Sequence, residues 1–368
     1  MKTEALVAMA PGIVPEVHEV ELDEPRDGEV LVEVGACAIG PADRLTWSGR
    51  DPDGLFPFVP GYEAAGRVLA IGPGVASLKR GDTVIPLVVP ECGRCSYCLS
   101  GRTNLCQALR KTQGRGVMPD GRARLSLRGE PLFHYMGVSA LARHLVIPEV
   151  AAARIDSEAP SAELALLCGP VATGMGAVFN VARVEPGESV AVFGLGPIGL
   201  AVVRAAALAG AERIVAVEPS NSKRCLAQKF GATHTILPAE LGTSPLETLT
   251  ALAGDVDVAF ECAGDAAAMQ VAIECTRKGW GRTIILGVVG ANERLAIHPA
   301  HFVLGRQVTG CAYGGIRGRS ELGKYLDLYR NGRMPVAPMI TAHATLGEAG
   351  AILARDTDCN VVRTVITF

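Results

Sequence analysis

The stretch Ser189–Gly210 constrains the fold of this chain more than any other, because it joins an apolar run to a helical run through a glycine-rich turn. Val190–Phe193 predicts a buried strand, and the Ala/Leu/Val-rich run that ends at Gly210 predicts a helix. The turn reads Gly-Leu-Gly-Pro-Ile-Gly, from Gly194 to Gly199. In such a pattern the first glycine permits the tight turn, the second lets backbone approach a pyrophosphate, and the third lets helix and strand pack closely. The free N–H groups of the helix N-terminus would then bind the phosphates.

A second strand makes a dinucleotide site more specific than an ordinary glycine turn. Ile214–Val217 predicts this strand, and Glu218 follows it directly, 24 positions after Gly194. An acidic residue there hydrogen-bonds the adenosine ribose hydroxyls and repels a 2′-phosphate. The sequence therefore predicts NAD as the cofactor, with NADP the less favoured alternative.

Length and composition exclude several classes of protein. A chain of 368 residues predicts two domains, and 49% hydrophobic residues is typical of a packed globular protein. The net charge of -3 gives no sign of a nucleic-acid or membrane-surface partner. No uninterrupted apolar run reaches the ~18 residues of a membrane span, and the first residues, with Glu4 among them, do not form a signal peptide. Eleven mostly isolated cysteines indicate a reducing compartment, so we expect a cytoplasmic protein.

Two patterns of secondary structure divide the chain. The first ~150 residues carry short β-branched runs between turn signals, which predict a small barrel. Strands and helices then alternate up to about residue 312, which predicts a parallel, doubly wound sheet. From Gly314 we expect one or two helices and a final strand that return to the first domain. The predicted strands are 17–22, 30–34, 66–71, 83–88, 190–193, 214–217, 235–237, 256–261, 283–288, 308–312 and 361–368, and two further helices are predicted over 222–230 and 266–276.

Four cysteines lie close together in the first part, at Cys92, Cys95, Cys98 and Cys106. Four thiolates at this spacing can close a tetrahedral zinc site, which leaves no open position for a substrate. Four unrelated buried thiols and an iron–sulfur cluster are the alternatives, although the fourth cysteine does not match ferredoxin-type spacing. We therefore predict one structural zinc.

Nine stretches together resemble one family along nearly the whole chain: 48–57, the four-cysteine lobe, 111–114, 118–121, 134–137, 194–199, 260–262, 278–281 and 363–365. They are similar to the zinc-dependent alcohol dehydrogenases of the medium-chain dehydrogenase/reductase superfamily, especially class III, the glutathione-dependent formaldehyde dehydrogenases. The resemblance implies an α/β protein with a GroES-like β-barrel catalytic domain over 1–170 and 314–368, including the zinc lobe at about 90–107. It also implies a Rossmann domain with a doubly wound parallel sheet over 171–313, an active site in the cleft, and a homodimer joined through the Rossmann domains.

The chain departs from this family at its catalytic zinc. The positions of the family's Cys, His and Cys ligands are held by Gly40, Tyr62 and Gly169. Two of these have no side chain, and a neutral tyrosine is a poor ligand. The acids that surround the ligands in the family persist as Asp43 and Glu63. The sequence therefore predicts the outer part of a zinc site without the ion.

Loss of this zinc would change the chemistry. A catalytic zinc lowers the pKa of bound water from 15.7 to about 7, which is roughly 12 kcal/mol of help in forming an anion. The family's hydroxyl relay is also lost, at Ala42, and Cys37 and Cys168 are expected to be small buried hydrophobes rather than replacement ligands. Hydride transfer itself needs only the nicotinamide and an electrophilic acceptor. Tyr62 would give that acceptor a hydrogen bond or a proton, with Asp43 as its partner, or would only fill space.

The remaining site residues are implied by the resemblance. The cofactor-binding set is Thr173, Gly194, Gly196, Pro197, Ile198, Gly199, Glu218, Lys223, Val288 and Arg363. Arg110 matches the class III arginine that binds a substrate carboxylate, so a small acidic substrate is expected unless Arg110 is only a surface residue.

Three functions fit the sequence. The first is an NAD(P)H-dependent reductase of an activated C=C or C=N bond that uses no catalytic zinc, with Tyr62, Asp43 and Glu63 as its catalytic residues. The second is a conventional NAD-dependent alcohol or aldehyde dehydrogenase with an altered metal site. The third is a nucleotide-binding protein that has lost its chemistry. The sequence names neither the substrate nor the physiological direction.

Overall fold

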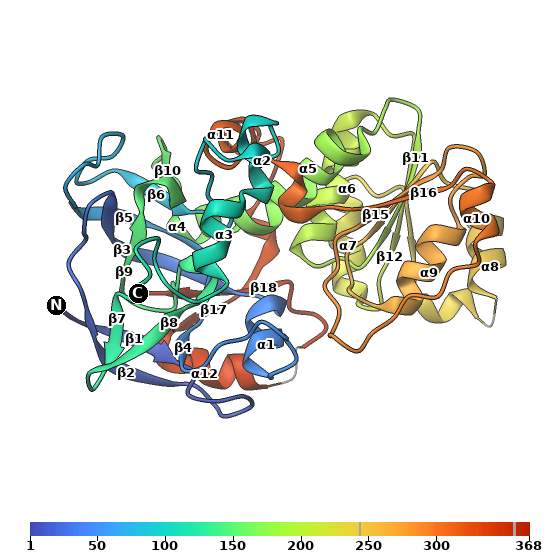
Figure 1. Cartoon of the computed structure of the whole chain (residues 1–368). Coiled ribbons are helices and arrows are strands. Elements are labelled where there is room, and N and C mark those ends of the chain that lie inside the picture. The colour runs from blue at the N-terminus through green and yellow to red at the C-terminus, as the bar shows by residue number, and fades with distance from the viewer. Residues whose placement is uncertain (243, 356–357) are drawn as a thin grey trace. The chain divides into compact units, whose positions relative to one another are not determined.

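The computed structural model describes residues 1–242, 244–355 and 358–368, which form two compact units (Figure 1). The first unit comprises Met1–Gly169, Ile316–Thr357 and Arg363–Phe368, and the second comprises Pro170–Gly315 and Asp358–Val362. The second unit thus includes a five-residue segment close to the end of the chain, which sequence patterns did not indicate.

The first unit contains two mainly antiparallel sheets. One has the order β1 (Lys2–Val7), β2 (Glu16–Leu22), β7 (Leu125–Leu127), β8 (Glu130–His134), β4 (Phe58–Val59). The other has the order β10 (Ala152–Ile155), β6 (Thr83–Pro86), β5 (Glu63–Ile71), β3 (Glu29–Ile39), β18 (Arg363–Thr367), β17 (Ile340–Thr345), and β9 (His144–Pro148) also pairs with β3. The predicted strands at 17–22, 30–34, 66–71, 83–88 and 361–368 correspond to β2, β3, β5, β6 and β18.

Strand β3 lies at the centre of this unit, because it pairs with β5, β9 and β18. Val30, Val32 and Val34 are buried, and the intervening Glu33 is exposed, as expected for a strand with one face on a core. The helices of the unit are α1 (Pro41–Trp47), α2 (Ser96–Leu99), α3 (Gln107–Gln113), α4 (Ser161–Leu166), α11 (Gly318–Arg330) and α12 (Leu346–Ala354). The last two fulfil the expectation of helices in the final part of the chain.

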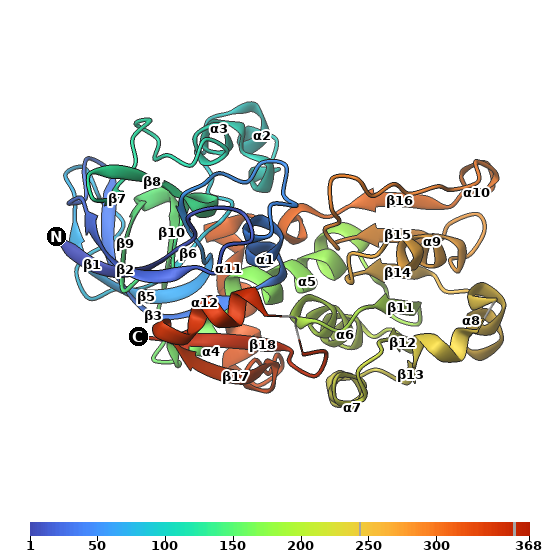
Figure 2. The same cartoon turned by 90° about the horizontal axis from the view of Figure 1, so that it is seen from below.

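The second unit is built on a six-stranded, fully parallel sheet. Its order is β13 (His234–Ile236), β12 (Arg213–Val217), β11 (Ser189–Phe193), β14 (Val258–Glu261), β15 (Arg282–Ile285), β16 (Gln307–Gly310), and Figure 2 shows these strands side by side. The helices are α5 (Ala172–Gly176), α6 (Pro197–Ala209), α7 (Asn221–Phe230), α8 (Pro245–Ala253), α9 (Ala266–Glu274) and α10 (Ala300–Val303). The predicted fold class is therefore confirmed. The predicted strand 283–288 ends early, at Ile285, because the chain leaves the sheet there.

One helical stretch, 161–182, is long and apolar enough to cross a membrane by length and composition alone. It includes two π-helical turns, Leu167–Val171 and Ala177–Ala182. Its apolar window is 78% buried inside the structure, which is the pattern of a core helix.

Candidate functional site

The glycine-rich turn of the second unit has the geometry of a phosphate-binding turn. Gly194 has a φ of 87°, a left-handed conformation that favours glycine. A Cβ atom added at Gly199 would collide with the carbonyl oxygen of Gly194, so helix α6 and the turn can approach only with glycine there. A Cβ at Gly196 would meet no atom within 4 Å, so this backbone faces open space next to the N-terminus of α6. The three glycines therefore meet the requirements of a site for a pyrophosphate.

Glu218 connects the end of β12 to this turn. Its carboxylate accepts hydrogen bonds from the backbone N–H of Leu195 at 2.8 Å and of Ser220 at 3.1 Å. The residue is buried, and each carboxylate oxygen keeps a further lone pair for a ribose hydroxyl. Ser220 in turn caps α7 by accepting from the N–H of Lys223, which places Lys223 in the first turn of that helix.

Several predicted cofactor residues follow strands of the same parallel sheet. Gly194 follows β11, Glu218 follows β12 and Val288 lies three residues beyond β15. Ligands of open parallel sheets bind outside the carboxyl ends of the strands. Val288 is 70% exposed and is thus free to contact a ligand. Thr173 is half-buried on α5, next to Gly174, where a Cβ would lie only 2.6 Å from the carbonyl oxygen of Ile198.

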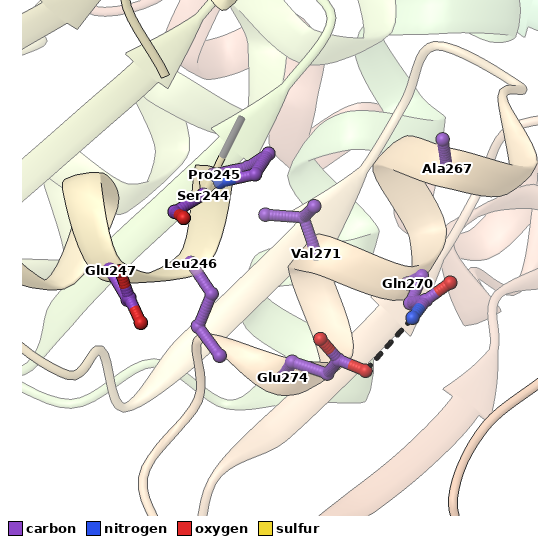
Figure 3. A pocket seen from close by; sticks show the side chains of 8 residues that line it. All are labelled: Ser244, Pro245, Leu246, Glu247, Ala267, Gln270, Val271 and Glu274. Atoms are coloured by element: carbon purple, nitrogen blue, oxygen red, sulfur yellow. Dashed lines mark hydrogen bonds between the residues drawn. The ribbon is translucent and has the colours of Figure 1, made fainter. Parts of the chain in front are cut away.

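A groove of about 390 Å³ lies elsewhere on the second unit, between α8 and α9 (Figure 3). Its side chains include Glu247, Gln270 and Glu274, and Gln270 donates a hydrogen bond to Glu274 at 3.1 Å. None of the predicted cofactor residues lines it. The groove therefore plays no part in the nucleotide site.

The three positions that correspond to zinc ligands converge in the first unit. A Cβ added at Gly40 would lie 3.3 Å from the Tyr62 hydroxyl oxygen and 3.5 Å from Oε1 of Glu63. A Cβ added at Gly169 would lie 3.3 Å from the same Oε1 and 2.8 Å from Cγ of Glu63. The Glu63 side chain and the Tyr62 hydroxyl thus fill the space on which the three positions converge. These residues offer neither a thiolate nor an imidazole, so they do not fit a catalytic zinc.

A buried ion pair holds Glu63 in this place. Nη2 of Arg363 lies 3.0 Å from Oε1 of Glu63, and Nη1 donates to the carbonyl oxygen of Ile39 at 3.3 Å. Both side chains of the pair are buried. The other carboxylate oxygen, Oε2, is buried without a hydrogen-bond partner among the described residues. The sequence did not indicate this pair, and the role of Arg363 at a pyrophosphate stays a prediction.

Asp43 ties together the two loops that flank Glu63. Its carboxylate accepts hydrogen bonds from the backbone N–H of Gly40 at 2.8 Å and of Gly61 at 2.9 Å. The expected partnership of Asp43 with the Tyr62 hydroxyl is replaced by these backbone contacts, because the hydroxyl lies next to Glu63. Asp43 therefore positions the segments that carry Gly40 and Tyr62.

Burial changes the acidity of this cluster. Desolvation raises the pKa of Glu63 to about 7, although the Arg363 charge opposes the rise. Desolvation also raises the pKa of Asp43 to about 6, against the two backbone hydrogen bonds. The pKa of Tyr62 lies well above its usual range, because of burial and then because of the nearby Glu63 and Asp43 charges. Near neutral pH the cluster thus holds a neutral tyrosine beside a carboxyl group that can gain and lose a proton.

The two other cysteines near these positions are buried, as expected. Cys37 belongs to the core around β3. Cys168 directs its thiol to the carbonyl oxygen of Pro86 at 3.4 Å. A thiol engaged in this way supports the expectation that Cys168 packs away from the zinc-ligand positions.

The four-cysteine lobe does fit a metal ion. The Sγ atoms of Cys92 and Cys98 are 4.0 Å apart, and those of Cys95 and Cys106 are 3.9 Å apart. All four lie within 4.8 Å of one another. A tetrahedral site with Zn–S distances of ≈ 2.3 Å needs sulfur separations of about 3.8 Å, so little movement is required. These residues would hold a structural zinc that leaves no position for a substrate.

Arg110 lies on α3, which begins directly after Cys106. Its side chain is exposed, so it is accessible to a ligand. Its role in substrate binding stays a prediction.

Comparison with known proteins agrees with both units. Residues 26–156 match the alcohol dehydrogenase GroES-like domain, and residues 197–331 match the zinc-binding dehydrogenase family. The chain is 44% identical to an S-(hydroxymethyl)glutathione dehydrogenase of Paracoccus denitrificans over 359 residues, 95% of each chain. It is 43% identical to one of Escherichia coli O157:H7 over the whole of both chains.

Solved structures give the same result. A zinc-binding alcohol dehydrogenase domain protein of Burkholderia ambifaria matches with a TM-score of 0.92 at 28% identity, covering 100% of this chain and 99% of that one. Benzyl alcohol dehydrogenase of Acinetobacter calcoaceticus matches with a TM-score of 0.91 at 25% identity and the same coverage. The resemblance inferred from sequence is thus confirmed. The chain belongs to the zinc-type alcohol dehydrogenase family, close to its class III members, and is an NAD(P)-dependent oxidoreductase.

Proposed function

We propose that this protein is an NAD(P)H-dependent reductase of an activated C=C or C=N bond, and that it transfers hydride without a catalytic zinc. The observation that carries the proposal is the cluster of Glu63, Tyr62 and Arg363, which fills the space between positions 40, 62 and 169. A relative with a zinc there gains roughly 12 kcal/mol toward an alkoxide-like anion. One hydroxyl and one carboxyl group cannot replace this, so the acceptor must already be electrophilic.

The residues of this chain would have separate tasks in such a reaction. When bound, the nicotinamide cofactor supplies the hydride. The glycine turn and Glu218 would bind its pyrophosphate and ribose, and Tyr62 would hydrogen-bond the charge that develops on the substrate. Asp43 and Arg363 would keep Tyr62 and Glu63 in place.

The second candidate is a conventional dehydrogenase with an altered metal site. The 43–44% identity to S-(hydroxymethyl)glutathione dehydrogenases favours it. A panel of substrates separates the two: we expect NADH-dependent reduction of conjugated ketones or cyclic iminium compounds, and little oxidation of primary alcohols or S-(hydroxymethyl)glutathione. Robust oxidation of the alcohols alone would favour the second candidate. An inactive protein that still binds NADH would favour a nucleotide-binding protein without chemistry.

We expect NADH to bind at least tenfold more tightly than NADPH. The buried Glu218 carboxylate lies between the glycine turn and α7, so it would repel a 2′-phosphate. Fluorescence titration of both cofactors measures this, with Glu212→Gln as a control because Glu212 is an exposed glutamate of the same unit. Equal or tighter binding of NADPH would contradict the role of Glu218.

We expect Arg110→Ala to raise KM for an acidic substrate about tenfold or more, because a charge-assisted hydrogen bond is lost. The Kd for NADH should stay unchanged. Arg115→Ala is a matched control, since Arg115 is also exposed and lies just beyond α3. If steady-state kinetics give the two variants the same KM, Arg110 is only a surface residue.

We also propose that the protein is a homodimer joined through β16. This strand is an edge of the parallel sheet, so one side of its backbone has no strand partner among the residues that the structure describes. Phe302 and Val303 of the neighbouring α10 are 50% and 85% exposed, which is unusual for large apolar side chains on a monomer. A second copy placed across a two-fold axis would cover both features.

The proposed location is the cytoplasm. None of the eleven cysteines, all of which lie within the described residues, forms a disulfide, and the four of the lobe must stay reduced to bind zinc. A small, acidic metabolite is the proposed partner, and nothing in charge or composition points to nucleic acid or a membrane.

A further inference from the structure

We propose that Glu63 is the proton source for the reduction and passes its proton to the substrate through the Tyr62 hydroxyl. This inference rests on the proposed function. The sequence predicts Glu63 as a catalytic residue but assigns it no chemical step. In the structure its carboxylate lies in the space that side chains at positions 40 and 169 would use, within 3.5 Å of the Cβ positions of both Gly40 and Gly169.

Gly40 and Gly169 leave the space that the Glu63 side chain occupies. A side chain at 169 would lie 2.8 Å from Cγ and 3.2 Å from Cδ of Glu63, so any other residue there would displace the carboxyl group. A Cβ at Gly40 would also lie 3.1 Å from Nη1 of Arg363, which belongs to the same cluster. Glycine at both ligand positions therefore leaves room for the Glu63 carboxyl group in this place.

The carboxyl group keeps one oxygen uncommitted. Oε1 accepts from Arg363, whereas Oε2 is buried and lacks a hydrogen-bond partner among the residues that the structure describes. An unpaired carboxylate oxygen in such a place is costly, whereas a protonated one is neutral and can donate. The Tyr62 hydroxyl lies beside this carboxyl group, and Tyr62 as a whole is half-buried whereas Glu63 is buried.

Tyr62 alone would be a poor acid. Burial and two nearby carboxyl groups raise its pKa well above the usual range, so a free phenolate would be disfavoured. A concerted transfer avoids the phenolate, because Tyr62 takes the Glu63 proton while it gives up its own. The Tyr62 hydroxyl thus relays a proton from the buried Glu63 carboxyl group to the substrate.

The step balances as follows for a conjugated ketone. The hydride from bound NADH adds to the β-carbon, and the electron pair of the C=C bond forms an enolate. The O–H bond of Tyr62 breaks as its proton joins the α-carbon, and the O–H bond of Glu63 breaks as its proton joins the Tyr62 oxygen. The products are the saturated ketone, NAD⁺, a neutral Tyr62 and an ionised Glu63, which regains a proton from solvent before the next turnover.

A pH dependence follows from the groups that face Glu63. These are Arg363 from β18, Asp43 from α1, Tyr62 beside it, Cys37 from β3 and Tyr135. The acid form of Glu63 is present below its pKa of about 7 and is lost above it. The kcat for a conjugated ketone should therefore fall about tenfold per pH unit above neutrality, provided that hydride and proton transfer limit the rate.

The test uses two substrates that differ in their need for a proton. A conjugated ketone needs one, whereas a cyclic iminium ion is neutral once it has received hydride. We expect Glu63→Gln to lower kcat for the ketone about 10²-fold and to remove the fall above neutral pH. The kcat for the iminium and the Kd for NADH should change less than about threefold. Glu33→Gln, an exposed glutamate on β3, is the matched control.

A second variant and a direct measurement cover the case in which Glu63→Gln does not fold. Gly169→Ala should displace the carboxyl group and give the same selective loss for the ketone. Infrared difference spectra of the wild type across neutral pH should show a protonated carboxyl band that titrates. Unchanged ketone kinetics and pH profile in Glu63→Gln, equal losses for both substrates, or the absence of that band would overturn the inference. A wild type that reduces neither substrate would instead overturn the proposed function.

Discussion

Replacing Tyr62 by phenylalanine should lower kcat for reduction of a conjugated ketone about 10²-fold. The hydroxyl oxygen of Tyr62 lies beside Gly40 and the Glu63 carboxyl group. Its removal therefore interrupts the proposed path of the proton from this carboxyl group to the substrate. Phenylalanine keeps the ring and its edge-on contact with Tyr135, whose centroid is 6.1 Å away, so the fold should be preserved. Steady-state kinetics and NADH titration give kcat and Kd separately.

Tyr97→Phe is the control for this experiment, because Tyr97 is a partly buried tyrosine of the zinc lobe. It should leave kcat unchanged. Full activity in Tyr62→Phe would show that Tyr62 only fills the space of a lost ligand, which was the alternative from the sequence.

Above about pH 8, where Glu63 is ionised in the wild type, replacing Arg363 by methionine should destabilise the protein by about 3–5 kcal/mol. The change removes the cation from a buried pair and leaves the Glu63 carboxylate without the partner 3.0 Å away. In a Glu63→Gln background the same replacement should cost much less, because no buried charge is left unpaired. Denaturant unfolding of the wild type, both single variants and the double variant measures the coupling.

Arg67→Met is a suitable comparison, since Arg67 lies on the surface, where it contacts Glu158 at 4.0 Å and the carbonyl oxygen of Gly81 at 3.4 Å. It should change stability by less than about 1 kcal/mol. Additive effects of Arg363→Met and Glu63→Gln would contradict the account of a coupled buried pair.

Sequence patterns predicted the second unit well and the first only in part. The apolar runs of β11, β12 and β14 are buried on both faces, so each is a continuous signal between helices. By contrast β4, β7 and β10 have two to four residues, and each has at least one partner far along the chain. Strands that short give no periodicity to detect.

The candidate site was likewise predicted only in part. Loss of the zinc ligands could be predicted from the sequence, because it shows directly which residue types occupy the three ligand positions. The position of the Glu63 carboxyl group could not be predicted, because it depends on packing between Gly169 in a helix and a strand more than a hundred positions away. The one available signal was that glycine, rather than a bulkier residue, holds two of the three ligand positions.

Hydride transfer without a catalytic zinc is the central claim, and metal content and activity measured on one sample test it most directly. Elemental analysis of the purified protein should find about one zinc per chain, held by Cys92, Cys95, Cys98 and Cys106. The same sample, in zinc-depleted buffer, should reduce a conjugated ketone or a cyclic iminium with NADH and barely oxidise primary alcohols. Two tightly bound zinc ions per chain, or robust alcohol oxidation by protein that carries only one, would contradict the account.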